Sequence, residues 1–471
     1  MENVFPLVWK RAIIKPLCKI SKPEELKDLR PISILPVVSK IVEKHVYQQI
    51  CSFVNTANII PDCQSGFRKN FSTTTSLVNL LNEVRCNEEK KERTCLGLLD
   101  FSKAFDTLNH EMLLAKLHFF GLSDNSIKFF KAYLSNRAHC VVVKKECSTQ
   151  KSNYIPMTTG VPQGSILGPL LFSLYVADMN NFIEHSKLQQ YADDSQVYIS
   201  FSLENSHTAQ ANFISDLDNI NSFAVDHNLK LNATKSCIIF LGSNRNNLNI
   251  LDNFNVKINN VPVPVVKEAK NLGVYFDTGL TFQTHIKNKL KIAYMRLKKL
   301  YYLKTILPSK TKYYLCETLI LSLFDYGDVV YNDSLTVQLS YAVQKVQNAC
   351  MRFSFIIPFR NHITPYLNNN SILNMKNRRN YHMYTFVYRI IKNGKPPYLR
   401  KHFNSYSHPH HTRNMHYFTV PQHRTANFQK SFVFVAVQLW NNLNNNVKEF
   451  SPNKFNKYIK KHLLEIQRSE V

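Results

Sequence analysis

Three aspartates in two parts of the sequence have the chemistry needed to hold divalent cations. Asp100 lies at the end of the apolar run 95–101, and Asp193 and Asp194 are neighbours between two apolar stretches. Carboxylate oxygens are the hard ligands that magnesium prefers. Two ions held in this way can activate an attacking oxygen and stabilise a leaving oxygen in an in-line displacement at phosphorus. Adjacent acids are also common in ordinary solvated turns, so the pair alone leaves both interpretations open.

The elements that would position these acids are predicted from the apolar periodicity. Residues 95–101 indicate a buried strand, and 188–199 indicate two strands joined at the acidic pair. A turn-rich loop with glycines at both ends is expected at 160–164. The remaining pattern predicts helices over 109–119, 126–134, 166–180 and 207–226, and strands over 139–144, 237–241 and 272–276.

Positive charge is concentrated in the C-terminal part. The chain has 59 Lys plus Arg and 33 Asp plus Glu, a formal net charge of +26. Residues 281–471 contain 29 of these cations and 7 of the acids, a net charge of +22. Residues 1–280 contain the other 30 cations and 26 acids, a net charge of +4. Clustered cations gain affinity for a phosphate backbone by releasing its counterions. AT-rich coding would also enrich lysine, but it would not remove acids from one half only, so a nucleic-acid surface is expected there.

The pattern in the same part of the chain becomes helical. Apolar residues recur at three- and four-residue spacing from Ile286 to Leu300, with lysines between them. Further helices are expected over 310–323, 335–353 and 377–391, and the main boundary is placed near residue 280. The lysines expected to reach a nucleic-acid backbone are Lys287, Lys291, Lys298 and Lys299.

Composition argues against several classes of protein. The ten cysteines include no CxxC pair, which speaks against a zinc knuckle and a disulfide framework. The first apolar stretch contains lysines and an arginine, unlike a signal peptide, and the longest apolar run, 166–177, falls short of the ~20 residues of a membrane helix. A protein of the nucleus or cytoplasm without membrane contact is expected. His408, His410 and His411 have no cysteine nearby and are interpreted as a solvated basic loop rather than a metal site.

Sequence motifs sharpen the interpretation of the acids. Residues 191–194 read YADD, 99–106 read LDFSKAFD, and 160–172 read GVPQGSILGPLLF. Upstream, residues 30–33 read RPIS and residues 64–68 read QSGFR. Downstream, the sequence has Leu231-Asn232 followed by Lys235, and then LGV at 272–274. In these motifs and their order the chain resembles the reverse transcriptases of non-LTR retrotransposons, most closely the jockey-like group. The resemblance covers about residues 9–280 and is looser beyond, where 325–327 and 343–348 also look familiar.

The resemblance implies an α/β (α+β) right-hand polymerase with a palm, fingers and a mainly helical thumb. Its parts would be fingers at 1–95, a palm with a finger insertion at 96–280, a helical thumb at 281–355, and a basic helical C-terminal region at 356–471. The implied activity is that of an RNA-directed DNA polymerase. It would extend a 3′-hydroxyl primer on an RNA template from dNTPs by two-metal phosphoryl transfer, in target-primed retrotransposition.

The resemblance also assigns roles to individual residues. Asp100 and Asp193 would ligate two Mg²⁺ ions, for which Mn²⁺ can substitute, with help from the backbone carbonyl of Phe101. Asp194 would complete the acidic cluster and contribute less direct coordination. Phe105, five residues after Asp100, would exclude the 2′-hydroxyl of a ribonucleotide; an ordinary core aromatic is the alternative.

Four further residues are predicted to contact the incoming nucleotide. Gln163 and Gly164 lie in a glycine-flanked loop that permits close backbone approach. Arg68 would bind the triphosphate through charge-assisted hydrogen bonds, and Lys235 would protonate the pyrophosphate leaving group. The alternatives are a plain turn for Gln163, a solvated finger arginine for Arg68 and a surface lysine for Lys235.

Other interpretations of the whole chain were weighed. A catalytically silent or domesticated remnant would keep the fold and bind nucleic acid, but the three acids are all present. An RNA-directed RNA polymerase is disfavoured by the aromatic Phe105, and the Val161 and Ser165 loop fits retrotransposons better than group II intron maturases. Nothing in the sequence resembles an endonuclease or an RNase H. We therefore expect either a fragment of a longer reading frame or a separate endonuclease that nicks the DNA target.

Overall fold

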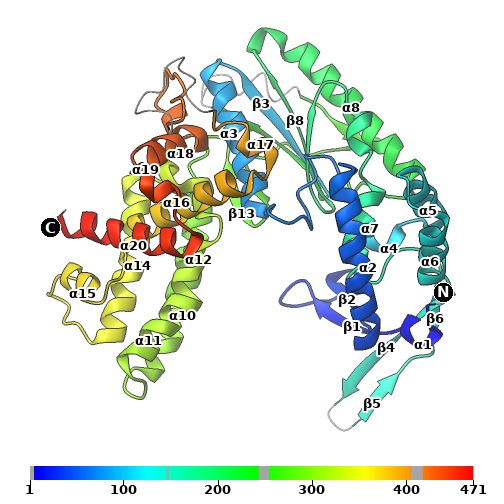
Figure 1. Cartoon of the computed structure of the whole chain (residues 1–471), viewed down its shortest axis with the longest axis horizontal. Coiled ribbons are helices and arrows are strands. Elements are labelled where there is room, and N and C mark those ends of the chain that lie inside the picture. Colours follow the sequence, from blue (N-terminus) through cyan, green and yellow to red (C-terminus); the bar gives the residue numbers. More distant parts are fainter. Residues whose placement is uncertain (1–4, 146–147, 243–253, 405–416, 470–471) are drawn as a thin grey trace.

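The computed structural model describes residues 5–145, 148–242, 254–404 and 417–469. Figure 1 shows a central sheet from which two lobes extend, one built from the N-terminal elements and the other from the helices after residue 282. His408, His410 and His411 lie outside the described residues. Among the helices that are described, none is long and apolar enough to cross a membrane.

The central sheet is antiparallel and buried on both faces. Its strands lie in the order β7 (Lys187–Tyr191), β8 (Asp194–Phe201), β3 (Arg93–Leu99) and β9 (Cys237–Leu241). Side chains alternate across a strand, so Cys95 faces helix α8 (Ser206–Asp226) and Leu96 faces helix α3 (Thr73–Glu89). This two-sided burial explains why residues 95–99 of β3 form a continuous apolar run rather than an alternating one.

A second sheet forms the N-terminal lobe with its surrounding helices. The strand order is β2-β1-β4-β5, β6 also pairs with β4, and β1 and β4 run parallel. The strands are β1 (Arg11–Cys18), β2 (Leu29–Ile34), β4 (Arg137–Lys145), β5 (Ser148–Lys151) and β6 (Ile155–Met157). The helices of this lobe and of its junction with the central sheet are α1 (Leu7–Lys10), α2 (Val37–Thr56), α4 (Ala104–Thr107), α5 (His110–Phe119), α6 (Asp124–Leu134) and α7 (Gly168–Tyr175).

Two small hairpins connect the central sheet to the helical lobe. They are formed by β10 (Lys257–Ile258) with β11 (Val261–Pro262), and by β12 (Glu268–Asn271) with β13 (Val274–Asp277). The predicted strand 272–276 begins two residues late, because Leu272 and Gly273 have φ of 44° and 83° and form the turn before β13.

Every named element from α10 onward is a helix. The α-helices are α10 (Gln283–Leu300), α11 (Ser309–Cys316), α12 (Ser322–Asp325), α13 (Asp328–Tyr331), α14 (Val337–Phe355), α15 (Thr364–Asn369), α16 (Met375–Asn393), α17 (Pro397–Arg400), α18 (Phe432–Asn441), α19 (Asn445–Lys448) and α20 (Pro452–Ser469). Between them lie the π-helical turn η6 (Glu317–Leu321) and the short 3₁₀ helices η5 (Tyr301–Leu303), η7 (Asn332–Ser334) and η8 (Phe428–Lys430). Apolar residues of α10–α14 share one core with α3 and the adjacent face of the central sheet. The helical lobe is therefore anchored on the sheet that carries the acidic motifs.

Candidate active site

Strand register brings the two acidic motifs together. Leu99 pairs with Ser195 across the β3–β8 ladder, so Asp100, the residue that follows β3, lies at the same edge of the sheet as Asp194. The β7–β8 hairpin closes between Tyr191 and Asp194. Asp193 is one of its two turn residues. The structure thus places the three aspartates, which are distant in sequence, at one end of two adjacent strands.

The electrostatics of the three acids show that they affect one another. Loss of surrounding water, followed by repulsion from Asp193 and Asp100, raises the pKa of Asp194 to about 6, although its side chain still reaches solvent. The pKa of Asp193 is raised by desolvation and by Asp100, and the charge of Arg30 opposes both shifts. Desolvation also raises the pKa of Asp100, while Lys235 and Lys19 lower it. A divalent cation would relieve this repulsion, so the donor set suits magnesium.

The segment 230–236 holds the backbone around Asp100. Asn232 N–H donates to the Asp100 carbonyl at 2.8 Å, and Ser102 N–H donates to the Lys230 carbonyl at 2.8 Å. Phe101 is the residue between these two bonds and forms a bridge with Leu231. In this antiparallel register the pairing does not use the Phe101 carbonyl, which remains a backbone acceptor beside the acids.

The hairpin turn is clamped by the upstream motif 64–68. The Gln64 side chain accepts from Ala192 N–H at 3.0 Å and donates to the Ala192 carbonyl at 3.2 Å. Gly66 lies so close that an added Cβ would stand 2.3 Å from the Ala192 nitrogen. Ala192 itself has φ of 60°, a backbone conformation that costs a non-glycine residue energy. The clamp therefore holds the turn that presents Asp193.

Phe105 lies in an aromatic stack beside the acidic edge. Its ring stacks on Phe172 of α7 with centroids 4.5 Å apart, and meets the Phe67 ring edge-on at 6.4 Å. Phe105 is half-buried, so one part of the ring still reaches solvent. The packing restricts ring motion, which a steric role towards a sugar requires.

The loop 160–164 is fixed by contacts on both sides. Gln163 donates its Nε2 to Asp106 Oδ1 at 2.8 Å, and its carbonyl accepts from Ser33 N–H of β2 at 2.7 Å. Gly164 has φ of 135°, and an added Cβ would lie 2.4 Å from the Ser33 carbonyl oxygen. Only glycine permits this close approach between loop and strand.

A buried carboxylate supports the same loop from behind. Glu43 of α2 is fully buried, and its Oε2 accepts from the backbone N–H groups of Ile166 and Leu167 at 2.7 and 3.3 Å. Burial raises the pKa of Glu43, against the lowering effect of these two bonds and of the Arg137 charge. The carboxylate thereby fixes the start of α7, immediately after the glycine loop.

The arginine and lysine predicted to contact the nucleotide differ in their surroundings. Arg68 donates to the carbonyls of Pro61 and Gln64 at 2.8 and 3.1 Å, and its guanidinium lies 4.2 Å from the Phe71 ring centroid. These contacts brace the loop that holds the clamp. Lys235 is exposed and lies close enough for its charge to lower the pKa of Asp100. Their predicted substrate contacts stay predictions.

The four lysines predicted to contact nucleic acid lie along α10. All four side chains are exposed, and the helix packs through its opposite residues, including Ile286, Ala293 and Leu297. Lys289 behaves differently, because burial lowers its pKa to about 8, and its Nζ donates to the Tyr326 carbonyl at 3.0 Å. On α10, Lys289 therefore has a structural role, whereas the four exposed lysines form a cationic outer face.

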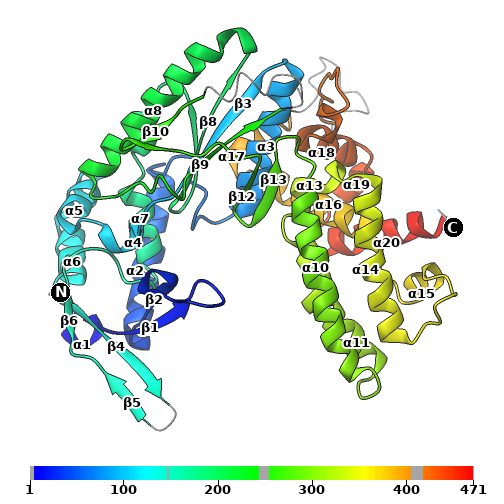
Figure 2. The ribbon, with the colours of Figure 1, turned by 180° about the vertical axis from the view of Figure 1, so that it is seen from behind.

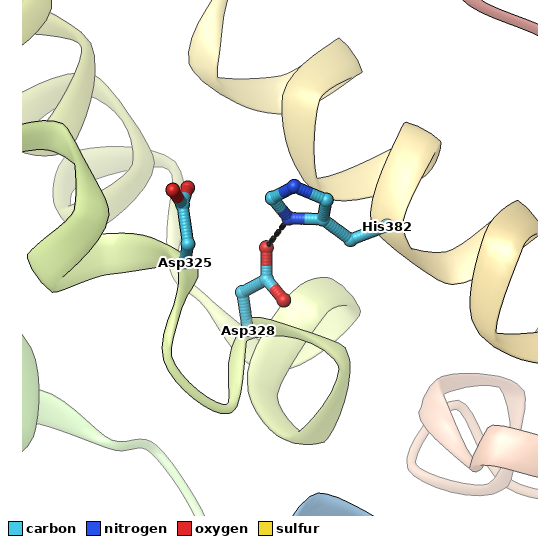
Figure 3. Close-up of side chains that lie close together, drawn as sticks. All are labelled: Asp325, Asp328 and His382. Carbon is cyan, nitrogen blue, oxygen red and sulfur yellow. Dashed lines mark hydrogen bonds and ion pairs between the residues drawn. The ribbon is translucent and has the colours of Figure 1, made fainter. Parts of the chain in front are cut away.

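Another group of possible ligands lies in the helical lobe. Among the described residues, Asp325, Asp328 and His382 bring their ligand atoms within 4.8 Å of one another (Figure 3). The ligand atoms of Asp100, Asp193 and Asp194 do not all lie within that distance of one another. His382 Nδ1 lies 2.5 Å from Asp328 Oδ2, and Asp325 accepts two bonds of 2.7 Å from Arg378. Because protein cations already satisfy these carboxylates, the group is an ion-pair network between α12–α13 and α16.

Several residues of the site were not assigned roles from the sequence. Glu43 has no recognisable signal in the sequence, and Arg30 and Gln64 stand out only as parts of motifs. The C-terminal region also reaches the clamp, because Tyr398 of α17 forms hydrogen bonds with Ser65 at 2.9 Å and Thr75 at 3.1 Å. A contact over more than 300 residues of sequence could not be inferred from local pattern.

Carboxylates at a strand end and in a hairpin turn lie beside a glycine loop and an aromatic stack, and the fold is that of a right-hand polymerase. The reverse transcriptase (RNA-dependent DNA polymerase) family matches residues 20–276. The chain belongs to this family. That match covers both acidic motifs, the clamp and the glycine loop.

Similar proteins of known name agree with the family. The chain is 32% identical over 293 residues to a probable RNA-directed DNA polymerase from transposon X-element of Drosophila melanogaster, covering 60% of this chain and 30% of the relative. It is 31% identical over 326 residues to the RNA-directed DNA polymerase from mobile element jockey of Drosophila funebris, covering 66% and 34%. The chain thus spans about a third of the length of these curated relatives. A telomerase structure from Candida Tropicalis is similar at a TM-score of 0.40 and 11% identity, covering 79% and 62%.

Proposed function

We propose that the chain is an RNA-directed DNA polymerase that extends a 3′-hydroxyl primer on an RNA template. The observation that carries this proposal is the convergence of Asp100 with Asp193 and Asp194 at one edge of the central sheet. Asp100, Asp193 and the Phe101 carbonyl would hold two Mg²⁺ ions, which Mn²⁺ could replace, and Asp194 would complete the negative cluster. Such ions, when bound, stabilise the attacking and leaving oxygens of phosphoryl transfer.

The residues around the cluster would select and orient the nucleotide. Phe105, held by Phe172, would present a rigid ring edge where a ribose 2′-hydroxyl would collide. The Gln163–Gly164 loop, fixed by Asp106 and Ser33, would approach the base and sugar through its backbone. Both features support selection of dNTPs over ribonucleotides by shape.

Cations near the acids would receive the triphosphate. Arg30 and Lys235 are exposed, and their charges lower the pKa values of Asp193 and Asp100 respectively. A triphosphate in this place would gain charge-assisted hydrogen bonds from them, and Lys235 could deliver a proton to the pyrophosphate. We also assign Arg68 a structural role. It donates to the carbonyls of Pro61 and Gln64 and so braces the loop that holds the clamp.

The exposed lysines of α10 would bind the backbone of the template–primer duplex. Lys287, Lys291, Lys298 and Lys299 present positive charge without a sequence-reading element, so the contact would be independent of sequence. We propose that the chain acts inside the cell, in the nucleus or cytoplasm, on an RNA template and a DNA target. In target-primed synthesis the 3′-hydroxyl would come from a nick made by an endonuclease.

Primer extension on an RNA template tests the proposal. The full chain should incorporate dNTPs onto an annealed DNA primer with Mg²⁺, lose that activity in EDTA, and regain it when Mg²⁺ or Mn²⁺ is restored. An inhibitor of cellular polymerases should leave the activity unchanged, which controls for contamination. Binding of the primed template without any extension at saturating metal would contradict the proposal and favour a nucleic-acid-binding protein.

A further inference from the structure

A groove at the outer edge of the helical lobe has the chemistry of a nucleic-acid site. It has a volume of about 820 Å³ and lies between α14, the segment 359–364, α15 and the start of α16. Figures 1 and 2 both place α15 on the side of this lobe that faces away from the N-terminal lobe. The groove is therefore separate from the acidic edge of the central sheet.

One face of α14 forms the floor of the groove. The lining residues of this helix recur at three- and four-residue spacing, which places them on one side. They are Val337, Ser340, Tyr341, Gln344, Asn348 and Arg352. The opposite wall is held in place by α14 itself, because Arg352 donates to the carbonyls of Pro358 and Asn361. A small apolar core beneath, including Met351, Ile363 and Leu367, fixes α15 on α14.

Two exposed aromatic rings border the groove. Phe359 is 89% exposed and Tyr341 is 60% exposed. A cation lies over each ring, Arg352 at 5.6 Å from the Phe359 centroid and Lys345 at 4.6 Å from that of Tyr341. Exposed rings beside cations, gathered at one positively charged groove, are the elements on which single-stranded bases stack.

The charge of the groove is positive. Its lining includes Arg352, Arg360 and Lys376, and among its described lining residues none is Asp or Glu. Amide side chains such as Asn348 and Asn361 add donors and acceptors that suit the edges of bases. Residues 356–471 as a whole hold 18 Lys plus Arg against 3 Asp plus Glu. The groove therefore favours a polyanion over a protein segment.

We propose that this groove binds single-stranded nucleic acid, as a second site beyond the template–primer duplex. Phe359 and Tyr341 would stack with bases, and Arg360 and Lys376 would contact phosphates. A duplex cannot use exposed rings in this way, because its bases are already stacked on one another. The site would retain an unpaired part of the template or target strand, and it does not depend on whether the chain polymerises.

Fluorescence anisotropy tests the proposal with the full chain already saturated by an unlabelled primer–template hairpin. The probes are labelled single strands of about 15 nucleotides, one RNA and one DNA of the same sequence. Replacing Tyr341→Ala and Phe359→Ala together should weaken binding of at least one probe about tenfold. Replacing Arg360→Gln and Lys376→Gln together should flatten the slope of log affinity against log salt by about 1.4.

Matched variants control for nonspecific loss. Phe119→Ala with Tyr302→Ala removes rings that are 85% and 81% exposed outside the groove, and Lys457→Gln with Lys460→Gln removes exposed charge from α20. Both should keep the wild-type affinity and salt slope. The proposal is overturned if the groove variants match the wild type, if the Tyr302 control loses as much affinity, or if the hairpin displaces both probes completely. All these side chains are exposed, so unchanged circular dichroism is expected throughout.

Discussion

Replacing Asp194 by Asn should stabilise the metal-free protein at neutral pH. Desolvation, together with Asp193 and Asp100, raises the pKa of Asp194 from 3.8 to about 6. An acid whose pKa is higher in the folded chain takes up a proton on folding. Its contribution to stability is complete below the unfolded pKa and is lost as the pH rises through about 6. Above that pH the wild-type chain bears the cost of an ionised carboxylate, which Asn removes.

The expected gain in the free energy of unfolding follows from the difference between the folded and unfolded pKa of Asp194. A rise from 3.8 to about 6 corresponds to at most about 3 kcal/mol. The Asp194 side chain is exposed, so solvent screening reduces this to about 1 kcal/mol. For 471 residues the unfolding entropy makes this a change of only about 1 °C in Tm. The midpoint of urea unfolding at constant temperature is therefore the better measurement.

Urea unfolding of the wild type and Asp194→Asn would be compared in EDTA from about pH 7.5 down to about pH 4. The gain should be largest at the upper pH, shrink towards the lower, and disappear when Mg²⁺ is added. Asp218→Asn, an exposed acid on α8, is the control and should show no such trend. Destabilisation by Asp194→Asn at neutral pH, or a gain independent of pH, would refute the reasoning.

Three other substitutions probe the supporting structure. Phe105→Val should remove the steric barrier to a 2′-hydroxyl and raise ribonucleotide incorporation at least about tenfold in single-turnover assays. Changing Lys291, Lys298 and Lys299 together to Gln should flatten the salt slope of duplex binding by about 3 and lower processivity, while single-nucleotide addition survives. Glu43→Ala leaves one half-buried and one buried N–H group without an acceptor, so it should cost about 1–3 kcal/mol of stability and raise the KM for dNTPs.

Each substitution has a control on the same chain. Phe119→Val removes an exposed ring that is not part of the stack, and unchanged dNTP selectivity in Phe105→Val would argue against the steric role. Charge removal at Lys454, Lys457 and Lys460 of α20 should leave duplex processivity intact. If the α10 variant matches it, those lysines are only a solvated face. Glu204→Ala removes an exposed acid, and equal effects from both Glu variants would exclude a specific role for Glu43.

Much of the central sheet could be predicted from local pattern. The apolar run ending at Asp100 predicted a strand that the structure places at Arg93–Leu99. The hairpin predicted to turn at Asp193 and Asp194 turns at Ala192 and Asp193 instead, so Asp194 is the first residue of β8. These features are local, because burial on both faces and turn chemistry mark the sequence directly. The resemblance to the family, rather than periodicity, predicted that Asp100 acts at one site with Asp193 and Asp194.

Where prediction failed, distant contacts set the structure. The helix expected over 166–180 ends at Tyr175, and its start at Gly168 follows backbone N–H groups that Glu43 caps from α2. The helix expected over 310–323 contains a π-helical turn at Glu317–Leu321, where Arg296 of α10 donates to the Leu319 carbonyl. Neither Glu43 nor Arg296 differs from a surface residue in its local sequence.

The central claim is that the acidic edge performs RNA-templated DNA synthesis. Its most direct test is single-turnover addition of one dNTP to a DNA primer on an RNA template by wild type and Asp193→Asn, with template–primer affinity measured in parallel. We expect the Asn variant to bind the primed template like the wild type and to lose extension by a factor of at least about 1,000, equivalent to about 4 kcal/mol. Extension by Asp193→Asn at the wild-type rate would contradict the account.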